Sequence, residues 1–433
     1  MSKPIASARE RLEQILARLS ARATDERVFT RVFFDTARRE ADASDERLAE
    51  GRVLGPLDGR LVSIKDLFDN AGEPTLAGSV IRRSAEPARE DAPVVERLRS
   101  AGAVIIGKTL MTEFAFTAVG FNPHYPVAGN AVDPACIAGG SSTGAGISVA
   151  EGTSEISIGS DTGGSVRIPA ALNGVVGFKP TAKRVPLQGA CPLAPSLDSI
   201  GPLARTVRDC ALADSIMAAE KECFPEPISL RGLRIGIPSG QLLDGVETRV
   251  AQAFERSLQS CSKAGATVVD CPVDDLIDAM AAATSVGSIA GIEASRVHAG
   301  WLHDDTLDVD PRVQRPLLRR LEVSQADYFD LMHKRQMLVH EMDRRIGAYD
   351  LLALPTVPVL APPIQAIADS EALYKQTEGL LLRNPQVANQ FDLTAISLPM
   401  PGMTMPGGLM LMARHGADRR LLAMALSVET ILF

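Results

Sequence analysis

Residues 138–180, AGGSSTGAGISVAEGTSEISIGSDTGGSVRIPAALNGVVGFKP, form the most unusual stretch of the sequence. Two segments rich in glycine and serine lie in it, 139–144 (GGSSTG) and 159–165 (GSDTGGS), each followed by residues suited to the start of a helix or strand. Glycines beside serines let the backbone adopt positive φ and bring N–H groups close to a bound group. The stretch is therefore a candidate site, and its surroundings predict the fold that carries it.

Apolar runs and amphipathic segments alternate on both sides of this stretch. Residues 61–64 are a short apolar run ending at Lys65, which predicts a buried strand with a lysine at its C-terminal end. A helix followed by an apolar strand is typical of a sheet that helices cover on both faces. The same alternation is expected at helix 92–100 with strand 103–106, at strand 233–238 with helix 247–264 and strand 267–271, and at helix 328–346 with strand 350–354.

The sequence therefore predicts an α/β protein with a single domain. We expect a central mixed, mostly parallel sheet covered by helices on both faces, which is an α/β/α sandwich. Amphipathic residues at 7–22 and a second helix at about 31–48 predict a helical N-terminal lead-in. The expected parts of the domain 1–433 are the lead-in over about 1–55, a core with the glycine-serine stretch over about 60–205, and the remaining sheet with substrate-pocket elements over about 206–433.

The composition is that of a globular protein with a large core. The 433 residues carry 45 Lys and Arg against 53 Asp and Glu, a net charge of −8, and 45% of them are hydrophobic. No basic block stands out, which argues against a nucleic-acid partner, because a polyanion binder needs a continuous positive face. The sequence starts without a signal-like segment and has no apolar run of about 18 residues, so we expect no membrane partner and a cytoplasmic location.

The cysteines and histidines suggest neither a metal site nor a disulfide framework. The six cysteines lie far apart without a C-x-x-C pair, and neither H-E-x-x-H nor another histidine pair at helix spacing occurs. We expect free thiols that mostly pack as small core residues. We expect no metal and no other cofactor.

Two chemistries use glycine-rich backbone of this kind, phosphate cradles and oxyanion holes. Neither segment is followed by the lysine of the pattern G-x-x-x-x-G-K-[ST], and the dinucleotide pattern G-x-G-x-x-G fails as well. A serine nucleophile would need a base, and no histidine lies in or near the two segments. Lys65 is the best candidate base from the pattern alone. Structural glycine turns and an exposed strand-end lysine are the alternatives.

Further segments outside the two glycine-serine segments match one known family. They are 61–66 (LVSIKD), 91–108 (DAPVVERLRSAGAVIIGK), 166–170 (VRIPA), 174–181 (GVVGFKPT) and 196–205 (SLDSIGPLAR). On these residues the chain resembles the amidase signature family, over most of its length from about residue 55. The resemblance implies an amide hydrolase with a Ser–Ser–Lys triad.

The resemblance assigns catalytic roles to particular residues. The family's catalytic lysine falls on Lys65, its relay serine on Ser141 and its nucleophile on Ser165. In the family the peptide bond into the relay serine is cis, so a cis bond is expected at Gly140–Ser141. The implied oxyanion hole consists of the backbone N–H groups of Thr162, Gly163, Gly164 and Ser165.

The implied activity is hydrolysis of a small-molecule carboxamide through an acyl-enzyme on Ser165, which releases ammonia or an amine. Carbamates, ureas and esters are alternative substrates for the same chemistry. A second hypothesis is the glutaminase (A) subunit of a tRNA-dependent amidotransferase, which would deliver ammonia to a partner. Family members are often dimers, so a homodimer is a further expectation.

A lysine acts as a base only when it is neutral. An ordinary lysine has a pKa near about 10.4, so the pKa of Lys65 must fall by about 3 for work near pH 7–8, and burial produces changes of that size. The apolar run before Lys65 is consistent with burial. Asp66 follows directly, but on a strand it points to the opposite face, so we expect a structural role.

Several residues near the motif leave two interpretations open. Ser142 is an alternative relay, and we prefer Ser141 because its spacing to Ser165 meets that of the family. Asp161 and Arg167 flank the nucleophile, and a structural ion pair or loop tie is expected rather than a catalytic part. A methionine cluster near the C-terminus either packs in core strands or lines an adaptable acyl pocket. These methionines are Met400, Met403, Met405, Met410 and Met412.

Overall fold

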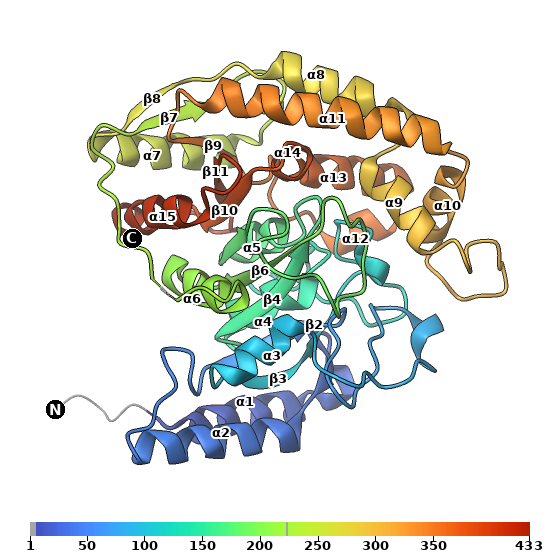
Figure 1. Cartoon of the computed structure of the whole chain (residues 1–433), viewed down its shortest axis with the longest axis vertical. Coiled ribbons are helices and arrows are strands. Elements are labelled where there is room, and N and C mark those ends of the chain that lie inside the picture. Colours follow the sequence, from blue (N-terminus) through green and yellow to red (C-terminus); the bar gives the residue numbers. More distant parts are fainter. Residues whose placement is uncertain (1–5, 222–223) are drawn as a thin grey trace.

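The computed structural model describes residues 6–221 and 224–433 (Figure 1). The strands are β1 (Phe29–Val32), β2 (Leu61–Lys65), β3 (Val104–Thr109), β4 (Ile156–Asp161), β5 (Val176–Lys179), β6 (Ser199–Ala204), β7 (Arg234–Ile237), β8 (Thr267–Asp270), β9 (Leu351–Pro355), β10 (Thr394–Pro399) and β11 (Gly408–Ala413). The α-helices are α1 (Ala8–Ala21), α2 (Phe34–Ala49), α3 (Pro93–Ser100), α4 (Thr143–Glu151), α5 (Arg167–Asn173), α6 (Val207–Met217), α7 (Thr248–Lys263), α8 (Asp274–Ala283), α9 (Ile289–Val297), α10 (Pro311–Arg320), α11 (Gln325–Ile346), α12 (Ile364–Ala368), α13 (Glu371–Arg383), α14 (Pro385–Gln390) and α15 (Asp418–Leu432).

The described strands form one mixed sheet with the order β1-β3-β2-β4-β6-β5-β10-β11-β9-β7-β8. Four neighbouring pairs are parallel, namely β2 with β3 and β4, and β7 with β8 and β9. The other six described pairs are antiparallel. A mixed sheet was predicted correctly, but the expectation of a mostly parallel sheet is wrong. The reason lies in the centre, where β6, β5, β10 and β11 pair directly in antiparallel fashion.

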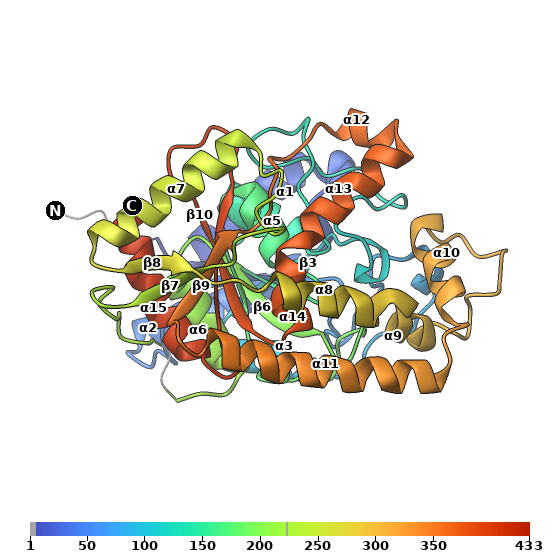
Figure 2. The ribbon, with the colours of Figure 1, turned by 90° about the horizontal axis from the view of Figure 1, so that it is seen from above.

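Helices lie on both sides of the sheet, which makes the predicted α/β/α sandwich (Figure 2). Alternation along β2 separates two cores. Leu61 packs with α1, α2 and Ile147 of α4, whereas Val62 and Ile64 belong to the larger core that contains residues of α3, α6 and α15. The strand end at Lys65 therefore lies between two packed layers, where a lysine is kept from water.

The N-terminal lead-in is helical, as predicted, and α1 and α2 pack together below the sheet in Figure 1. Helix α1 begins with a capping box, in which Ser7 accepts from the Glu10 N–H and the Glu10 carboxylate accepts from the Ser7 N–H. Between the helices lies β1, an edge strand that pairs antiparallel with β3. This strand was not predicted, because four residues are too few for a pattern of alternation to stand out.

One stretch in the described part of the chain, 274–297, is long and apolar enough by composition to cross a membrane. In the structure it is not one helix: α8 and α9 are separated around Gly287, whose φ is 147°. Met280 and Ile292 of this stretch are buried in the protein core. Core helices meet the same criterion of length and composition, so the stretch carries no argument for a membrane.

The described cysteines are free thiols, as expected. Four of them are buried and Cys191 is half-buried. Cys223, also expected to be a free thiol, lies outside the described residues. Across the parts of the chain that the structure describes, no group of three or more His, Cys, Asp or Glu side chains is placed to hold a metal ion.

Candidate active site

Lys65 ends β2 between the parallel neighbours β3 and β4, and its side chain is fully buried. Its ammonium nitrogen Nζ lies 2.7 Å from Ser141 Oγ and 2.8 Å from Ser160 Oγ. Both partners are hydroxyls, and no described carboxylate forms an ion pair with Lys65. The predicted base and the predicted relay are therefore in direct contact.

Burial lowers the pKa of Lys65 to about 7, although the negative charges of Asp161 and Asp198 act in the opposite direction. The cause is the loss of water around the charged form, which a buried site penalises. At and above about pH 7 the amine is neutral in a large fraction of molecules. This is the property that a lysine base requires.

Ser141 lies just before α4, and the Gly140–Ser141 bond is cis, as the family resemblance implied. Its carbonyl accepts a hydrogen bond from the Thr112 N–H at 3.2 Å. The hydroxyl is fully buried and faces Lys65. The loop after Gly139 therefore presents this serine to the end of β2.

Ser142, the alternative relay, is held by the strand next to Lys65. Its hydroxyl donates to the Ser160 carbonyl at 3.2 Å and accepts from the Ser160 N–H at 3.3 Å. Gly159 makes room for it, because a β-carbon at that position would lie 2.7 Å from Ser142 Oγ. The main-chain N–H of Ser142 donates to the Ser165 carbonyl at 3.2 Å. These contacts favour Ser141 as the relay and give Ser142 the role of joining the two glycine-serine segments.

Ser165 follows β4 and precedes α5, so it sits on the turn between a strand and a helix. It lines a cavity of about 420 Å³ together with Thr162 and Gly163. Within the described residues its hydroxyl makes no hydrogen bond, to Ser141 or to any other group. The structure thus joins the turn of Ser165 to the segment of Ser141 and Ser142 through the main chain, without a closed hydrogen-bonded chain of the three predicted side chains.

The four N–H groups predicted for the oxyanion hole are not equivalent. The Gly164 N–H donates to Asp161 Oδ1 at 2.9 Å, so it is already used. Among the described groups, the N–H groups of Thr162, Gly163 and Ser165 have no acceptor. The prediction of Gly164 as a free donor is therefore wrong for this structure, because the turn folds its amide back onto the Asp161 carboxylate.

Asp161 and Arg167 form the expected ion pair, at 2.8 Å with both side chains fully buried. The carboxylate also accepts from the Val166 N–H and from Asn389 of α14. Arg167 in turn donates to the Pro385 carbonyl at 2.7 Å. The pair ties the turn that carries the predicted nucleophile to α14, which agrees with a structural role.

Sequence reasoning missed two residues that hold the site. Ser160 is the second partner of Lys65, and Asn389 bonds Asp161 from 228 residues further along the chain. Ser160 could have been found, because it lies inside the second glycine-serine segment, 159–165, which was singled out as a candidate site. Asn389 carried no signal, because its position follows only from the packing of α14.

Asp66 points to the other face of the sheet, as predicted. Its carboxylate lies 3.6 Å from the ammonium of Lys108 on β3. Burial raises the pKa of Asp66 to about 6, while Lys108 acts to lower it. The Lys108 ammonium also donates to the Pro74 carbonyl at 2.8 Å. This pair is structural and has no contact with the cavity of Ser165.

The methionines do not line the cavity that contains Ser165. Met410 and Met412 of β11 and the nearby Met400 are buried in the protein core. Met403 and Met405 line a separate surface pocket beside α7. The core interpretation therefore holds for three of the five, and the acyl-pocket alternative is wrong for all of them.

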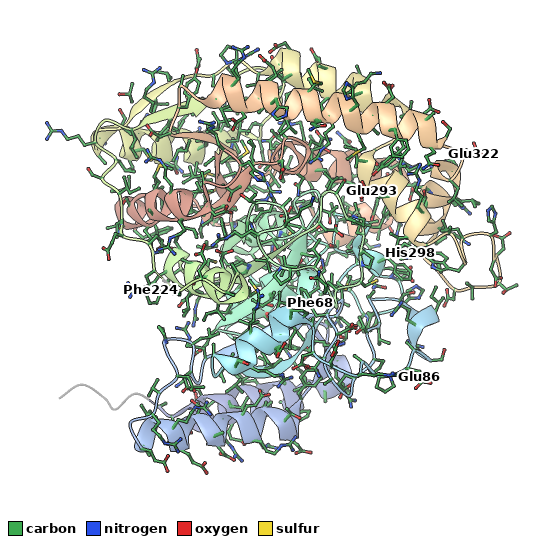
Figure 3. All side chains as sticks on the ribbon, in the orientation of Figure 1. Phe68, Glu86, Phe224, Glu293, His298 and Glu322 are labelled. Atoms are coloured by element: carbon green, nitrogen blue, oxygen red, sulfur yellow. The ribbon has the colours of Figure 1, made fainter. Side chains whose placement is uncertain are left out.

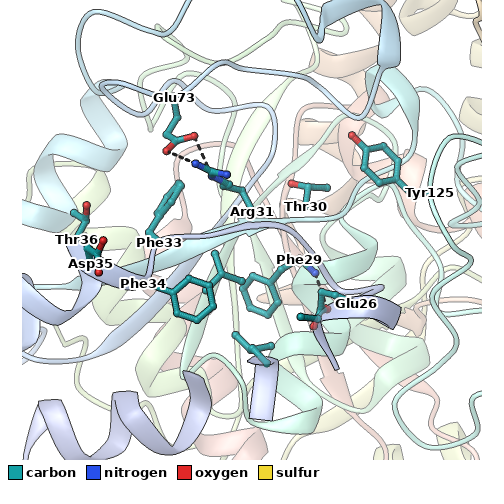
Figure 4. Close-up of a pocket in the computed structure, with 13 residues that line it drawn as sticks. Glu26, Phe29, Thr30, Arg31, Phe33, Phe34, Asp35, Thr36, Glu73 and Tyr125 are labelled. Atoms are coloured by element: carbon teal, nitrogen blue, oxygen red, sulfur yellow. Dashed lines mark hydrogen bonds and ion pairs between the residues drawn. The ribbon is translucent and has the colours of Figure 1, made fainter. Parts of the chain in front are cut away.

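A second cavity, of about 630 Å³, lies at the edge strand β1 (Figure 4). Figure 4 shows Phe29 and Phe33 in its wall, and an ion pair between Arg31 and Glu73 across its rim. It contains none of the residues predicted for the triad. We therefore assign the candidate active site to the smaller cavity at Ser165.

An α/β/α sandwich that holds a buried lysine against a serine is the fold and site of a hydrolase that acts on C–N bonds. Comparisons with known proteins identify the family. The family model Amidase matches residues 10–422, and the chain belongs to the amidase signature family. A solved amidase structure superposes with a TM-score of 0.88 at 34% identity, covering 99% of this chain and 97% of that one.

Two relatives show how wide the family is. The chain is 35% identical over 402 residues to 2-amino-5-chloromuconic acid deaminase of Comamonas testosteroni, covering 92% of this chain and 86% of the relative. It is also 35% identical over 399 residues to the A subunit of glutamyl-tRNA(Gln) amidotransferase from Chloroflexus aurantiacus (strain ATCC 29366 / DSM 635 / J-10-fl), covering 84% of this chain and 82% of the relative. Family membership therefore leaves the substrate to be derived from the cavity.

Proposed function

We propose that the protein hydrolyses a small-molecule carboxamide through an acyl-enzyme on Ser165, with Ser141 and Lys65 as the proton relay. The observation that carries the proposal is the 2.7 Å contact between Lys65 Nζ and Ser141 Oγ inside a fully buried site. A lysine whose pKa is lowered to about 7 is neutral often enough at pH 7–8 to accept a proton. A serine beside such a base can act as a nucleophile or a relay.

In the proposed first half-reaction Ser165 Oγ attacks the amide carbonyl carbon. Its proton moves to Ser141 Oγ, and the Ser141 proton moves to Lys65 Nζ. The tetrahedral intermediate then expels the amine or ammonia, which takes its proton back through Ser141 from Lys65. In the second half-reaction water attacks the acyl-enzyme by the same route and releases the carboxylic acid.

The negative oxygen of the tetrahedral intermediate needs donors that are already in place. The unpaired backbone N–H groups of Thr162, Gly163 and Ser165 are suited to this role. Thr162 is held by a hydrogen bond from its hydroxyl to Asp198 at 2.6 Å. The Asp161 carboxylate holds the same turn by accepting from the Val166 N–H. Loss of one donor in a comparable site lowers the rate by about 10²–10³-fold.

A partner-dependent function is the second candidate, and the 35% identity to the A subunit of an amidotransferase favours it. In that case the same site would release ammonia for a partner protein. Ammonia release by the isolated chain separates the two candidates, because a stand-alone amidase needs no other protein. Carbamate, urea or ester hydrolysis would use the same groups and differ only in the substrate.

The test is product release from a panel of small carboxamides, with carbamate, urea and ester analogues alongside. We expect amine or ammonia release by the wild type, and losses of about 10²–10⁴-fold in kcat for Ser165→Ala, Ser141→Ala and Lys65→Met. Lys65→Met keeps the volume of the side chain and removes the amine. Thermal unfolding of each variant controls for folding, and full activity of Ser165→Ala would overturn the proposal.

A further inference from the structure

The cavity at Ser165 has an unequal balance of charge at its walls. Four cationic side chains line it and a single carboxylate, Glu378, does so. Its remaining walls include apolar side chains such as Phe116, Leu193 and Leu382. The cations are Arg312, Arg319, Arg320 and Lys375. In a chain with a net charge of −8, this local excess of positive charge favours the binding of an anion in the cavity.

Two of these cations already have partners. Arg312 and Lys375 each lie 3.5 Å from Glu371, and the Arg312 guanidinium stacks over the Tyr374 ring. The one carboxylate of the wall, Glu378, accepts from the Ala118 N–H at 3.1 Å. Burial raises the pKa of Glu378, which favours its neutral form. Glu378 therefore does little to balance the remaining cations.

Arg320 has no acidic partner among the residues that the structure describes. Its Nη1 donates to the Pro316 carbonyl at 2.9 Å, but its Nε is buried without a hydrogen-bond partner. The neighbouring Arg319 likewise has no ion pair in the described chain. A guanidinium without a counter-ion binds a planar carboxylate well, because two of its parallel N–H groups can donate to the two carboxylate oxygens.

The acids close to Arg320 in the fold are directed elsewhere. Glu293 of α9, labelled in Figure 3, accepts from the Ser196 N–H and from the Tyr328 hydroxyl. Glu322, also labelled in Figure 3, follows Arg320 by two residues, is exposed and makes no described ion pair with it. No described carboxylate therefore neutralises the Arg320 guanidinium, which lines the cavity.

Gly291 lets the Arg320 side chain take this position. A β-carbon at Gly291 would overlap both Cδ and Nε of Arg320. The same first turn of α9 contributes Ser288, Ile289 and Ala290 to the wall of the cavity. Arg320 therefore lies across the start of α9 because position 291 carries no side chain.

The geometry points to Arg320, with Arg319 beside it, as the binding site for a carboxylate of the substrate, so that the enzyme acts on carboxylate-bearing amides such as the monoamides of dicarboxylic acids. This inference rests on the proposed function, whose chemistry at Ser165 it completes with a substrate class. One relative, 2-amino-5-chloromuconic acid deaminase, acts by its name on an acid. The apolar walls suit the short carbon chain between the amide and the carboxylate.

The test compares monoamides of three- to six-carbon dicarboxylic acids with neutral isosteres, for example succinamate with 4-methylpentanamide. We expect kcat/KM to favour the acids by about 10- to 100-fold, the range of a hydrogen bond to a charged group. In Arg320→Met this preference is lost through a higher KM, while kcat/KM for the neutral amides stays close to that of the wild type. Arg320→Lys retains part of the preference, because it keeps the charge and loses the bidentate geometry.

Two more variants complete the design. Gly291→Ala displaces Arg320 without changing its charge and is expected to raise KM for the acids alone. Arg256→Met removes an exposed arginine of α7, outside this cavity, and is expected to change neither substrate class. Equal kcat/KM values for acids and isosteres in the wild type, or equal losses for both in Arg320→Met, would overturn the inference.

A separate readout keeps this result distinct from a failure of the proposed function. Succinate, glutarate and adipate should slow the labelling of Ser165 by a fluorophosphonate in the wild type and not in Arg320→Met. Labelling that all three leave unchanged overturns the carboxylate site even if amides are hydrolysed. If Ser165 is not labelled and no amide is hydrolysed, the proposed function fails, and the carboxylate site fails with it.

Discussion

Two buried lysines, Lys65 and Lys108, lie on neighbouring parallel strands with their side chains on opposite faces of the sheet. Lys108 lies 3.6 Å from Asp66 and donates to a main-chain carbonyl. Among the described residues, the Lys65 ammonium donates hydrogen bonds to two hydroxyls, those of Ser141 and Ser160, and to no other group. Burial lowers the pKa of both. The difference teaches that burial alone does not make a base: in the proposed mechanism the base is the lysine whose partners are hydroxyls rather than a counter-ion.

The largest expected effect comes from exchanging each lysine for methionine. Lys65→Met should lower kcat by about 10²–10⁴-fold with the fold intact, because a general base is lost. Lys108→Met should leave kcat of the folded enzyme near that of the wild type and lower the free energy of unfolding by about 3 kcal/mol, because it leaves Asp66 unpaired. Steady-state kinetics and urea unfolding of both variants check this. Similar losses of kcat in the two variants would break the comparison.

The Asp161–Arg167 pair extends the comparison to a buried charge that does have its counter-ion. Arg167→Met should lower the free energy of unfolding by about 3–5 kcal/mol, because a buried carboxylate is left unpaired. The matched control is the exposed pair of Arg414 and Asp343, at 2.7 Å, whose removal should cost less than about 1 kcal/mol. Denaturant midpoints give both values. An Arg167→Met protein as stable as the control would refute the structural role of the pair.

The pH dependence of stability sharpens the comparison further. The pKa of Lys65 is about 7 in the folded chain and has its ordinary value of 10.5 in the unfolded chain, so between these values the unfolded chain binds a proton that the folded chain does not. The contribution of Lys65 to the free energy of unfolding therefore rises as the pH rises from about 7 to 10.5. Below about pH 7 Lys65 is protonated in both states, and the buried charge lowers the stability of the folded chain. Lys65→Met should flatten this slope in urea titrations at several pH values. A slope identical to that of the wild type would contradict a lowered pKa.

The smallest effect is expected at Ser160, which shares Lys65 with Ser141. Ser160→Ala should lower kcat by about 3- to 10-fold, because one net hydrogen bond of about 1 kcal/mol that orients the amine is lost. Ser63→Ala, on the same face of β2 and fully buried, should leave kcat unchanged. The pH profile of kcat in both variants is the second readout. A loss in Ser63→Ala equal to that in Ser160→Ala would point to general loosening of the strand.

The sequence was most informative where the chemistry is local. The apolar run before Lys65 predicted a buried strand end, and both the strand and its burial are found. The two glycine-serine segments predicted a functional loop system, and the cis bond at Gly140–Ser141 followed from the family resemblance. These features depend on residues that are neighbours in the chain.

The sequence was least informative where distant segments meet. The direction of β10 and β11 could not be predicted, because alternation of helix and strand says nothing about antiparallel pairing between strands far apart in the chain. The contact of Asn389 with Asp161 depends on how α14 packs. The use of the Gly164 N–H by Asp161 depends on the shape of one turn, which composition does not determine.

The central claim is that neutral Lys65 activates Ser165 through Ser141. Its most direct test is the rate at which a fluorophosphonate labels Ser165, followed by mass spectrometry from pH 5 to 9 in the wild type and in Lys65→Met. The account predicts a single adduct on Ser165 whose rate rises about tenfold per pH unit, levels off above about pH 7, and is strongly reduced in Lys65→Met. A rate independent of pH, an adduct on another residue, or an unchanged profile in Lys65→Met would contradict it.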